Sequence, residues 1–349
     1  FTTSTLQQRA SSVLNFSAKK TMFIAQQLYE GIDIGSEGTV GLISYIRTDS
    51  TRLANEARGE AKGYIKDNFG DEYYQGRNYG KSGSNTQDAH EAIRPTSAFR
   101  SPDKMKKYLS KDQYALYNLI WNQFIGSQMK PARYKTFAID ILNGKYNFRF
   151  NGSELIFPGF LTLFNGDNND DYIPQVNEKD TIKAENIEPD QHFTNPPPRF
   201  TEASLVKTME EEGIGRPSTY APTLSKIVSR NYVDKKGKYF IPTDLGKTVN
   251  GLLNEYFPDV TDIEFTAQLE KRLDEIEEGK EQWQQILKDF YSDFKERLDE
   301  AFENMEKVNM DIESDIKCDK CGRPMVIKHG RYGKFLACSG FPECKNTKP

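Results

Sequence analysis

The four cysteines of this 349-residue chain all lie near its C-terminal end, and they limit how that end can fold. Two residues separate Cys318 from Cys321, sixteen more precede Cys338, and five more precede Cys344. Two cysteines three positions apart on a tight turn, with Gly322 directly after them, can present both thiolates to one tetrahedral Zn²⁺. A disulfide scaffold would instead distribute its cysteines through the chain. The spacing therefore predicts a zinc site, and a structural one, because four thiolates leave no open position for a substrate.

The segment that contains these cysteines, 311–349, is too short to build much of a core of its own. Metal binding would therefore supply much of its folding free energy, and we expect a zinc ribbon over these residues. Reduced thiols without a metal are the alternative. Because the rest of the chain has no cysteine, the pattern indicates a reducing compartment.

Charge is unevenly distributed along the chain. The net charge is −4, but from residue 317 onward eight Lys and Arg face two acidic residues, so this tail carries +6. A basic tail on an acidic body suggests a polyanionic partner for the tail. Arg331, Tyr332 and Phe335 belong to a run in which rings and cations alternate, which suits base stacking and phosphate contact with single-stranded nucleic acid. The alternative is that these rings only pack the ribbon.

The body has the composition of folded domains, with 36% hydrophobic and 28% charged residues in the whole chain. No run of 18 apolar residues occurs, so we expect no membrane span. Apolar residues recur at helical spacing over 11–29 and 104–129. Short β-type runs follow over 134–157, where Asn-Gly pairs at 143–144 and 151–152 indicate hairpin turns. The sequence therefore predicts an α+β chain of several domains.

A tyrosine and an arginine lie two positions apart within 41–50. We expect a short strand over 42–46, and residues i and i+2 of a strand share a face, so Tyr45 and Arg47 could address one phosphate. A phenol with a pKa near 10 becomes a useful nucleophile only beside cationic groups. Alone, the pair is a weak signal, because the chain has 18 tyrosines and a structural role is the commoner one.

A second candidate is a histidine between charged neighbours. Of the three histidines, only His90 has both a carboxylate and a guanidinium beside it, in Glu91 and Arg94. Such a histidine can donate to a phosphate or transfer a proton. A helix-capping or core role is the alternative.

Around these residues the chain resembles the family of bacterial DNA topoisomerase I, a type IA enzyme. The motifs YIRTDST at 45–51 and AHEAIRP at 89–95 carry much of the resemblance. The other matching segments are 1–8, 19–22, 25–30, 199–206 and 212–220. They follow the family's order over nearly the whole chain, and the four-cysteine tail fits as well, which makes the resemblance highly specific.

The resemblance implies that Tyr45 attacks a phosphodiester of single-stranded DNA and forms a 5′-phosphotyrosine bond. Another strand would pass through the gap, and the break would be resealed without ATP. Arg47 matches the arginine that stabilises the phosphate charge. His90 matches a phosphate-contacting histidine, and Asp49 matches the carboxylate that orients this histidine.

The resemblance also implies DNA contacts outside this motif. Gln26 and Glu30 fall where the family has residues facing the active site, although the insertion 31–41 loosens that match. The other residues assigned to DNA contact are Thr48, Arg94, Arg216, Ser218 and Thr219. For the last two, a plain helix N-cap is the alternative.

The chain departs from the family in its acidic residues. Type IA enzymes begin with a Toprim domain whose Asp-x-Asp-x-x-Glu cluster binds Mg²⁺, and this sequence has no such cluster. We therefore expect a fragment that lacks Toprim, holds no Mg²⁺ ligands and does not complete relaxation alone. We also expect the strands over 134–157 to have open edges.

The expected fold is α+β in four parts: a helical catalytic-tyrosine domain at 1–128, a β-rich arch segment at 129–195, a helical single-strand DNA-binding domain at 196–308 and the zinc ribbon at 311–349. The expected partner is single-stranded or negatively supercoiled DNA. We expect a monomer without membrane contact, in the bacterial cytoplasm and associated with the nucleoid.

The competing hypothesis is a non-catalytic DNA-binding protein. The pattern over 202–241, two helices followed by a basic hairpin, is typical of a winged helix, here joined to a zinc ribbon. The motifs at Tyr45 and His90 favour the enzyme, because a regulator needs neither. A preference for single-stranded over duplex DNA would separate the two hypotheses.

Overall fold

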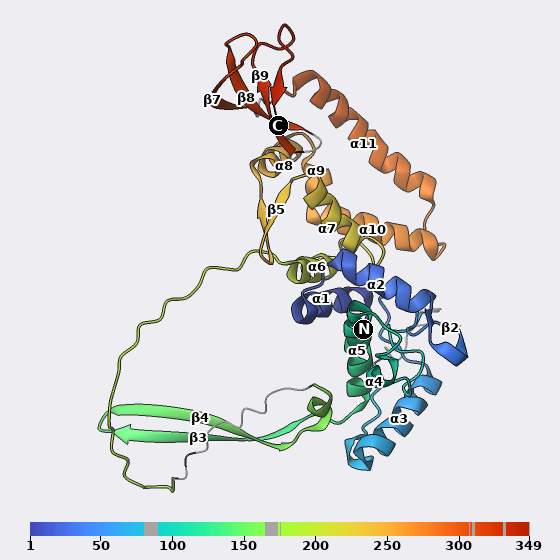
Figure 1. Cartoon of the computed structure of the whole chain (residues 1–349), viewed down its shortest axis with the longest axis vertical. Coiled ribbons are helices and arrows are strands. Elements are labelled where there is room, and N and C mark those ends of the chain that lie inside the picture. Colours follow the sequence, from blue (N-terminus) through green and yellow to red (C-terminus); the bar gives the residue numbers. More distant parts are fainter. Residues whose placement is uncertain are drawn as a thin grey trace. The chain divides into compact units, whose positions relative to one another are not determined.

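The computed structural model describes residues 1–79, 90–164, 174, 176–306, 308, 311–330 and 333–348 (Figure 1). The chain divides into two compact units. The first comprises residues 1–230 and 234–241, and the second comprises residues 231–233 and 242–349. Within the described residues, no helix combines the length and the apolar composition that a membrane span requires.

Both units consist mainly of helices, with small antiparallel sheets. Up to residue 164 the elements are α1 (Thr3–Leu14), α2 (Ala18–Glu30), β1 (Ile32–Asp33), β2 (Thr39–Val40), α3 (Asn55–Phe69), α4 (Pro102–Met105), α5 (Lys111–Gln128), β3 (Arg133–Asn143) and β4 (Tyr146–Phe157). The later elements are α6 (Glu202–Glu211), α7 (Tyr220–Ser229), β5 (Val233–Lys236), β6 (Tyr239–Pro242), α8 (Asp244–Tyr256), α9 (Pro258–Thr261), α10 (Ile263–Glu277), α11 (Trp283–Asn304), β7 (Ile312–Lys317), β8 (Pro324–Gly330), β9 (Gly333–Cys338) and β10 (Thr347–Lys348). Short 3₁₀ turns lie at Gly35–Glu37, Asp71–Tyr73 and Gly159–Leu163.

The helical pattern predicted over 11–29 covers only the end of α1, which begins at Thr3, and nearly all of α2. Asn15 ends α1 in the left-handed conformation, with φ 55°. Ser17 caps α2 by accepting a hydrogen bond from the Lys20 amide at 3.1 Å. Both helices pack with α5 on a core that includes the fully buried Leu116. The helical character is confirmed, and the break between the two helices is a local capping effect that apolar spacing does not reveal.

The strand expected over 42–46 is reduced to a single isolated bridge between Ile43 and Pro95. The Ser44 amide donates to the Arg94 carbonyl at 2.8 Å beside this bridge. Backbone hydrogen bonds therefore join the segment before Tyr45 to the segment after His90, although neither segment forms a regular strand.

The β3–β4 pair is a long two-stranded ribbon (Figure 1). The Asn-Gly pair at 143–144 forms its turn, with Gly144 at φ 60°. The turn predicted at 151–152 is wrong, because Gly152 lies within β4 opposite Phe137. A Cβ at Gly152 would lie 2.3 Å from the Phe137 ring, so the glycine provides the space for that ring.

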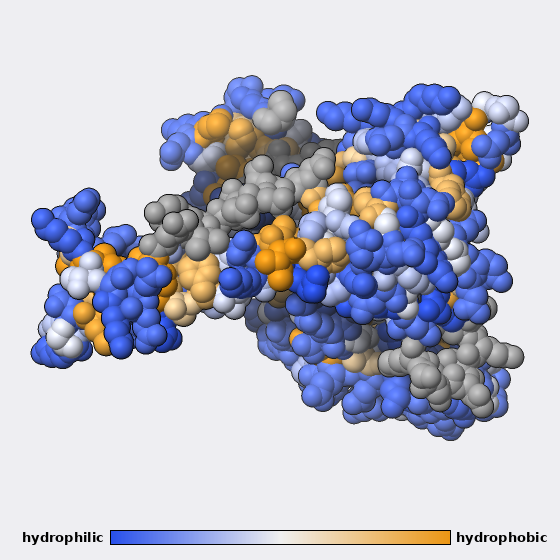
Figure 2. Space-filling model, turned by 90° about the horizontal axis from the view of Figure 1, so that it is seen from below, coloured by the Kyte–Doolittle hydropathy of each residue, from blue (hydrophilic) through white to orange (hydrophobic). Residues whose placement is uncertain are grey.

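Both edges of this ribbon are open, since no third described strand pairs with β3 or β4. Leu142 on β3 is 76% exposed, and Tyr146 and Ile156 on β4 are also exposed. Figure 2 shows hydrophobic residues, in orange, at the surface among hydrophilic ones. The open edges expected from the sequence are thus present in the described part of the chain.

Helices α6 and α7 pack against α1 and α2 within the first unit. Glu202, at the start of α6, accepts a hydrogen bond from the Ala18 amide in the first turn of α2 at 2.5 Å. The positive end of the α2 dipole favours a carboxylate at this place. Glu210 accepts from the Ser4 hydroxyl of α1 at 2.6 Å. The domain boundaries expected near residues 128 and 195 therefore both fall inside one compact unit.

In the second unit, α8 to α11 surround an aromatic cluster. The Phe294 ring lies 5.7 Å from the Phe257 ring and 5.3 Å from the Phe290 ring, between centroids. The C-terminal sheet of the same unit has the strand order β10-β9-β8-β7, and every neighbouring pair is antiparallel. The helix-and-strand content and the C-terminal sheet agree with the α+β class predicted from the sequence.

Candidate functional site

The segment that contains the candidate nucleophile alternates between exposed and buried side chains. Tyr45, Arg47 and Asp49 are exposed, whereas Ile46 and Thr48 are buried. Successive residues of an extended chain point to opposite sides, so the buried residues anchor the segment and leave three functional side chains outside. Tyr45 and Arg47 thus share the exposed side, as predicted, without a regular strand.

The buried side of this segment is held by Thr3 in the first turn of α1. Its hydroxyl donates to the Ile46 carbonyl at 2.7 Å and accepts from the Thr48 amide at 2.9 Å. The Thr3 amide also donates to the Thr48 carbonyl at 2.8 Å. One helical residue therefore satisfies backbone groups of both buried positions, which would otherwise be costly to bury.

Tyr45 is 40% exposed, and its ring contacts two other rings. The His90 ring lies 5.5 Å away between centroids, at an interplanar angle of 33°. The Tyr29 ring, in the last turn of α2, lies 5.6 Å away in an edge-to-face arrangement at 66°. The structure therefore brings the two predicted catalytic motifs into contact and adds a residue that the sequence analysis did not assign.

Arg47 and Asp49 make no ion pair or hydrogen bond within the described residues. An exposed guanidinium two residues from Tyr45 can bind a phosphate in a bidentate manner. The structure shows no hydrogen bond between Asp49 and His90 in the described part of the chain. The expected orientation of His90 by Asp49 therefore has no counterpart in this conformation.

Glu91 is the carboxylate that fixes the His90 segment. Its Oε2 accepts from Arg94 Nε at 2.8 Å and from the Ala54 amide, at the start of α3, at 3.1 Å. Arg52 Nη2 donates to the His90 carbonyl at 3.3 Å. Burial alone raises the pKa of Glu91, but these hydrogen bonds and the charges of Arg94 and Arg52 outweigh it and hold the pKa below its usual range.

Two residues assigned to DNA contact are engaged inside the protein. Thr48 is 1% exposed, and its hydroxyl accepts from the Ser50 amide at 3.0 Å. The Thr48 side chain therefore stabilises the segment. Because it is buried, it cannot make the predicted DNA contact in this conformation. Arg94 is paired with Glu91 and donates to the Pro95 carbonyl at 3.0 Å, so a phosphate would have to compete with these partners.

Gln26 and Glu30 lie one turn apart on α2 and hydrogen-bond to each other, with Gln26 Nε2 donating to Glu30 Oε1 at 2.6 Å. The same turn of α2 contains Tyr29, which contacts Tyr45. Gln26 and Glu30 therefore lie on the same turn of α2 as a residue of the site. Of this turn, Tyr29 is the residue that contacts Tyr45. This contact could not be predicted from spacing along the chain, because the insertion 31–41 lies between Tyr29 and Tyr45.

The loop before α7 contains the predicted groove residues. Arg216 Nη1 donates to the Gly215 carbonyl at 2.7 Å, so its guanidinium folds back on the loop. Thr219 occupies the N-cap position of α7 but makes no capping hydrogen bond, and its hydroxyl accepts from the Arg216 amide at 2.8 Å. Ser218 and Thr219 are exposed. Both hydroxyls therefore lie at the surface beside an arginine.

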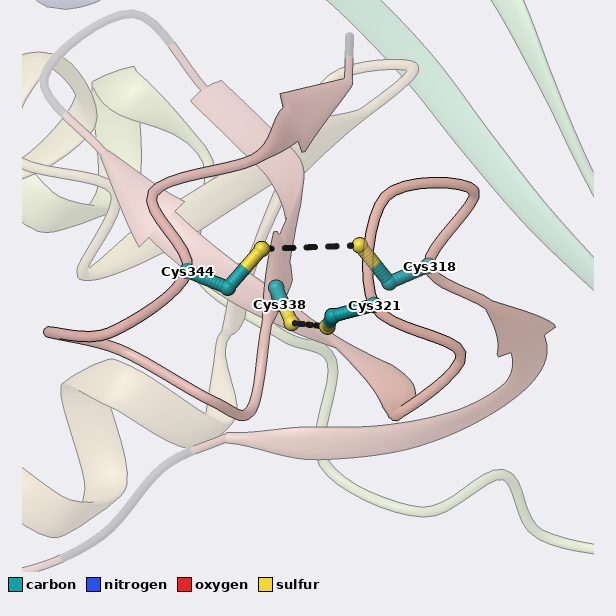
Figure 3. Close-up of side chains that lie close together, drawn as sticks. All are labelled: Cys318, Cys321, Cys338 and Cys344. Carbon is teal, nitrogen blue, oxygen red and sulfur yellow. Dashed lines mark hydrogen bonds between the residues drawn. The ribbon is translucent and has the colours of Figure 1, made fainter.

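The four cysteines converge in the C-terminal sheet, as Figure 3 shows. The Sγ atoms of Cys318 and Cys344 are 3.7 Å apart, those of Cys321 and Cys338 are 3.3 Å apart, and all four lie within 4.8 Å of one another. Zn–S bonds of 2.3 Å in a tetrahedron place sulfurs about 3.8 Å apart. The donor set and its spacing therefore fit Zn²⁺.

The surroundings of the sulfurs also suit a cation. Burial disfavours the Cys318 thiolate, but hydrogen bonds from the Asn346 side chain and from nearby amides lower the pKa of Cys318 to about 6. The Gly340 amide favours the thiolate of Cys338, but burial and the neighbouring sulfurs raise its pKa to about 12. Four thiolates this close need a cation to share their charge, and Zn²⁺ supplies it when bound.

The aromatic residues of the ribbon are only partly described. Arg331 and Tyr332 lie outside the described residues. Phe335 on β9 is half-buried opposite Lys328 on β8, and Phe341 is exposed. Phe335 is therefore able either to pack within the ribbon or to stack on a base.

The fold is that of the type IA topoisomerase class. A family model described as DNA topoisomerase matches residues 1–288, and one described as topoisomerase DNA binding C4 zinc finger matches residues 315–349. The chain belongs to the DNA topoisomerase family, as its motifs indicated.

The solved structures that resemble this chain include one that is similar over its whole length. It is full-length topoisomerase I from Thermotoga maritima, with 40% sequence identity and a TM-score of 0.74 over 100% of this chain. The match covers 56% of that protein, so the present chain spans little more than half the length of this relative.

Proposed function

We propose that this chain carries the cleaving tyrosine of an ATP-independent type IA DNA topoisomerase that relaxes negative supercoils. The observation that supports the proposal best is the contact between Tyr45 and His90, with Arg47 on the same exposed side as Tyr45 and without an ion-pair partner among the described residues. The two motifs are 45 residues apart in sequence and adjacent in space. A phenol, a guanidinium and an imidazole in one exposed place are suited to phosphodiester chemistry.

In the proposed step, Tyr45 Oη attacks the phosphorus of a single-stranded DNA phosphodiester. A bond forms between phosphorus and Oη, and the bond between phosphorus and the 3′ oxygen breaks. The phenol loses its proton and the 3′ oxygen gains one, so a 5′-phosphotyrosine and a 3′-hydroxyl result. One phosphate ester replaces another, so resealing by the reverse reaction needs no ATP.

The neighbouring side chains have separate proposed roles. Arg47 donates to the non-bridging oxygens, whose negative charge must be held as Oη approaches. His90 donates to the same phosphate. Asp49 acts on His90 only if one of these side chains moves when DNA binds. Gln26 and Glu30 face the bound strand, and Arg216, Ser218 and Thr219 bind its phosphates further along the groove.

Mg²⁺ is the cofactor that the family resemblance implies besides zinc. Among the described residues, the four cysteines form the one cluster of three or more candidate ligands that could hold a metal ion, and thiolates suit Zn²⁺ rather than Mg²⁺. The proposed steps are accordingly limited to side chains of this chain. Zinc, when bound, stabilises the folded ribbon. We propose that the ribbon binds single-stranded DNA through Arg331, Tyr332 and Phe335.

We further propose that the protein acts as a monomer on single-stranded or negatively supercoiled DNA, at the nucleoid in the bacterial cytoplasm. The basic tail supports a DNA partner, because counterion release drives binding of cationic segments to nucleic acid.

The test uses the full-length gene product with Mg²⁺ and without ATP. The parent should relax a negatively supercoiled plasmid and form a covalent adduct with single-stranded DNA, and Tyr45→Phe should do neither. Tyr134→Phe, which removes the hydroxyl of another exposed tyrosine on β3, is the matched control and should behave as the parent. Equal relaxation by Tyr45→Phe would show that another tyrosine is the nucleophile.

The winged-helix alternative finds a partial counterpart in the structure, since α6, α7 and the β5–β6 hairpin follow one another as that motif requires. However, α7, which would be the recognition helix, packs against α2 and buries Tyr220, Ala221 and Leu224. A recognition helix must be free to enter the major groove. Clearly tighter binding of duplex than of single-stranded DNA would favour this alternative.

A further inference from the structure

Tyr29 contacts the candidate nucleophile, Tyr45, although it lies outside both motifs, 45–51 and 89–95. Its ring lies edge-to-face against Tyr45 at 5.6 Å between centroids. Tyr29 is itself 38% exposed, so it does not serve mainly to fill the core. It lies in the last turn of α2, on the far side of the insertion 31–41 from Tyr45 in sequence.

Backbone contacts fix the distance between the two tyrosines. The Leu42 amide donates to the Leu28 carbonyl at 2.7 Å, which ties the segment before Tyr45 to the last turn of α2. Gly41 packs so closely that a Cβ there would lie 2.7 Å from the Tyr29 carbonyl oxygen. The two rings are therefore held next to each other by the backbones that carry them.

Tyr45 is 40% exposed, and the solvent on its open side offers little resistance to rotation about χ1. In-line attack requires the phenol oxygen within about 3–3.5 Å of phosphorus with the correct approach, so rotamers that point elsewhere do not react. Contacts with the Tyr29 and His90 rings remove part of this freedom before DNA binds.

We propose that Tyr29 is a positioning residue that holds the Tyr45 ring in its reactive orientation by ring packing, and that its own hydroxyl is not required. This inference rests on the proposed role of Tyr45 as nucleophile. Tyr29 acts through Tyr45, so its loss should slow cleavage without weakening DNA binding.

The experiment compares Tyr29→Leu with Tyr29→Phe in the full-length gene product. Single-turnover cleavage of a single-stranded oligonucleotide gives the rate constant, and fluorescence anisotropy of the same oligonucleotide gives Kd. We expect Tyr29→Leu to lower the cleavage rate constant about tenfold, the scale of a small misplacement of a reacting group, while Kd changes less than about twofold. Tyr29→Phe should restore the parental rate constant, because it keeps the ring.

Phe23→Leu is the matched control. Phe23 lies on the same helix and is 65% exposed, and its ring contacts no other ring among the described residues. This variant removes an aromatic ring from α2 without touching Tyr45, so both measurements should equal those of the parent. If Tyr29→Leu lowers the melting temperature, Tyr29→Met, which keeps more of the side-chain length, replaces it.

The outcomes separate this inference from the proposed function. A parental cleavage rate in Tyr29→Leu would overturn the inference, as would weaker binding with an unchanged rate constant, which would make Tyr29 a DNA contact. Equal loss in Tyr29→Phe would assign the effect to the hydroxyl and also overturn it. A covalent adduct formed by Tyr45→Phe would instead refute the nucleophile, whatever Tyr29 does.

Discussion

A single oxygen of Glu91 accepts the Arg94 side chain at 2.8 Å and, at 3.1 Å, the amide of Ala54. Glu91 thereby joins the His90 segment to the start of α3. Because the segment 90–95 also bridges the chain beside Tyr45 through Ile43 and Pro95, one half-buried carboxylate contributes to the placement of both candidate catalytic motifs.

Replacing Glu91 with Gln should lower the free energy of unfolding of the first unit by about 1–3 kcal/mol, because the charge-assisted bond to Arg94 is lost in a partly buried place. Chemical denaturation at neutral pH measures this difference. Glu72→Gln, an exposed residue in a 3₁₀ turn, is the control and should change stability little.

The Glu91 contribution should also depend on pH. The folded protein holds the pKa of Glu91 below its unfolded value, so this stabilisation is present above the unfolded pKa and is lost as pH falls through the folded pKa. The stability difference between the parent and Glu91→Gln should therefore shrink in acid. A difference that stays constant down to the acid-unfolding range would contradict this account.

Thr3→Val should destabilise the protein and impair cleavage together. The substitution removes the hydroxyl that satisfies the Ile46 carbonyl and the Thr48 amide, and leaving buried backbone groups unpaired costs about 1–3 kcal/mol each. Thermal unfolding and covalent-adduct formation are the measurements. Thr136→Val, on the exposed surface of β3, is the matched control. Unchanged stability in Thr3→Val would mean that water replaces the hydroxyl.

Arg47→Ala should slow cleavage by roughly 10²-fold, the usual loss when a donor to a developing anion is removed. Because Arg47 has no partner among the described residues, its removal should leave the melting temperature unchanged. Arg47→Lys should recover part of the rate, since a lysine keeps the charge but loses the bidentate geometry. Single-turnover cleavage measures all three proteins, and a parental rate in Arg47→Ala would refute the proposed role.

Removing zinc should unfold the ribbon and spare the first unit. A chelator, or Cys321→Ser, takes away the bonds on which the small C-terminal sheet depends, because its buried cluster holds little besides Met325 and two of the cysteines. Limited proteolysis should then cut within 311–349, while the first unit stays resistant. Ser339→Ala, next to Cys338 but without a metal-binding side chain, is the control. Resistance of the ribbon in the presence of chelator would contradict a structural zinc.

The hairpin and the helix break show where local patterns succeed and fail. The Asn-Gly pair at 143–144 makes the predicted turn, but the identical pair at 151–152 does not, since Gly152 serves a cross-strand contact with Phe137. Identical local signals led to different structures because the partner strand decides which pair turns. Similarly, the apolar spacing over 11–29 is uninterrupted, but the helix is not. Asn15 ends α1 and Ser17 caps the start of α2.

The sequence by itself determined the family, the zinc-binding cysteines and the exposed pairing of Tyr45 with Arg47, because each depends on residues a few positions apart whose geometry the local backbone sets. Only the tertiary structure decided what surrounds Tyr45. The contact with His90, the edge-to-face packing of Tyr29, the burial of Thr48 and the engagement of Arg94 by Glu91 all join segments that are distant in the chain. Such contacts follow from how the helices pack around one core. The spacing of residues along the sequence does not determine which distant segments meet there.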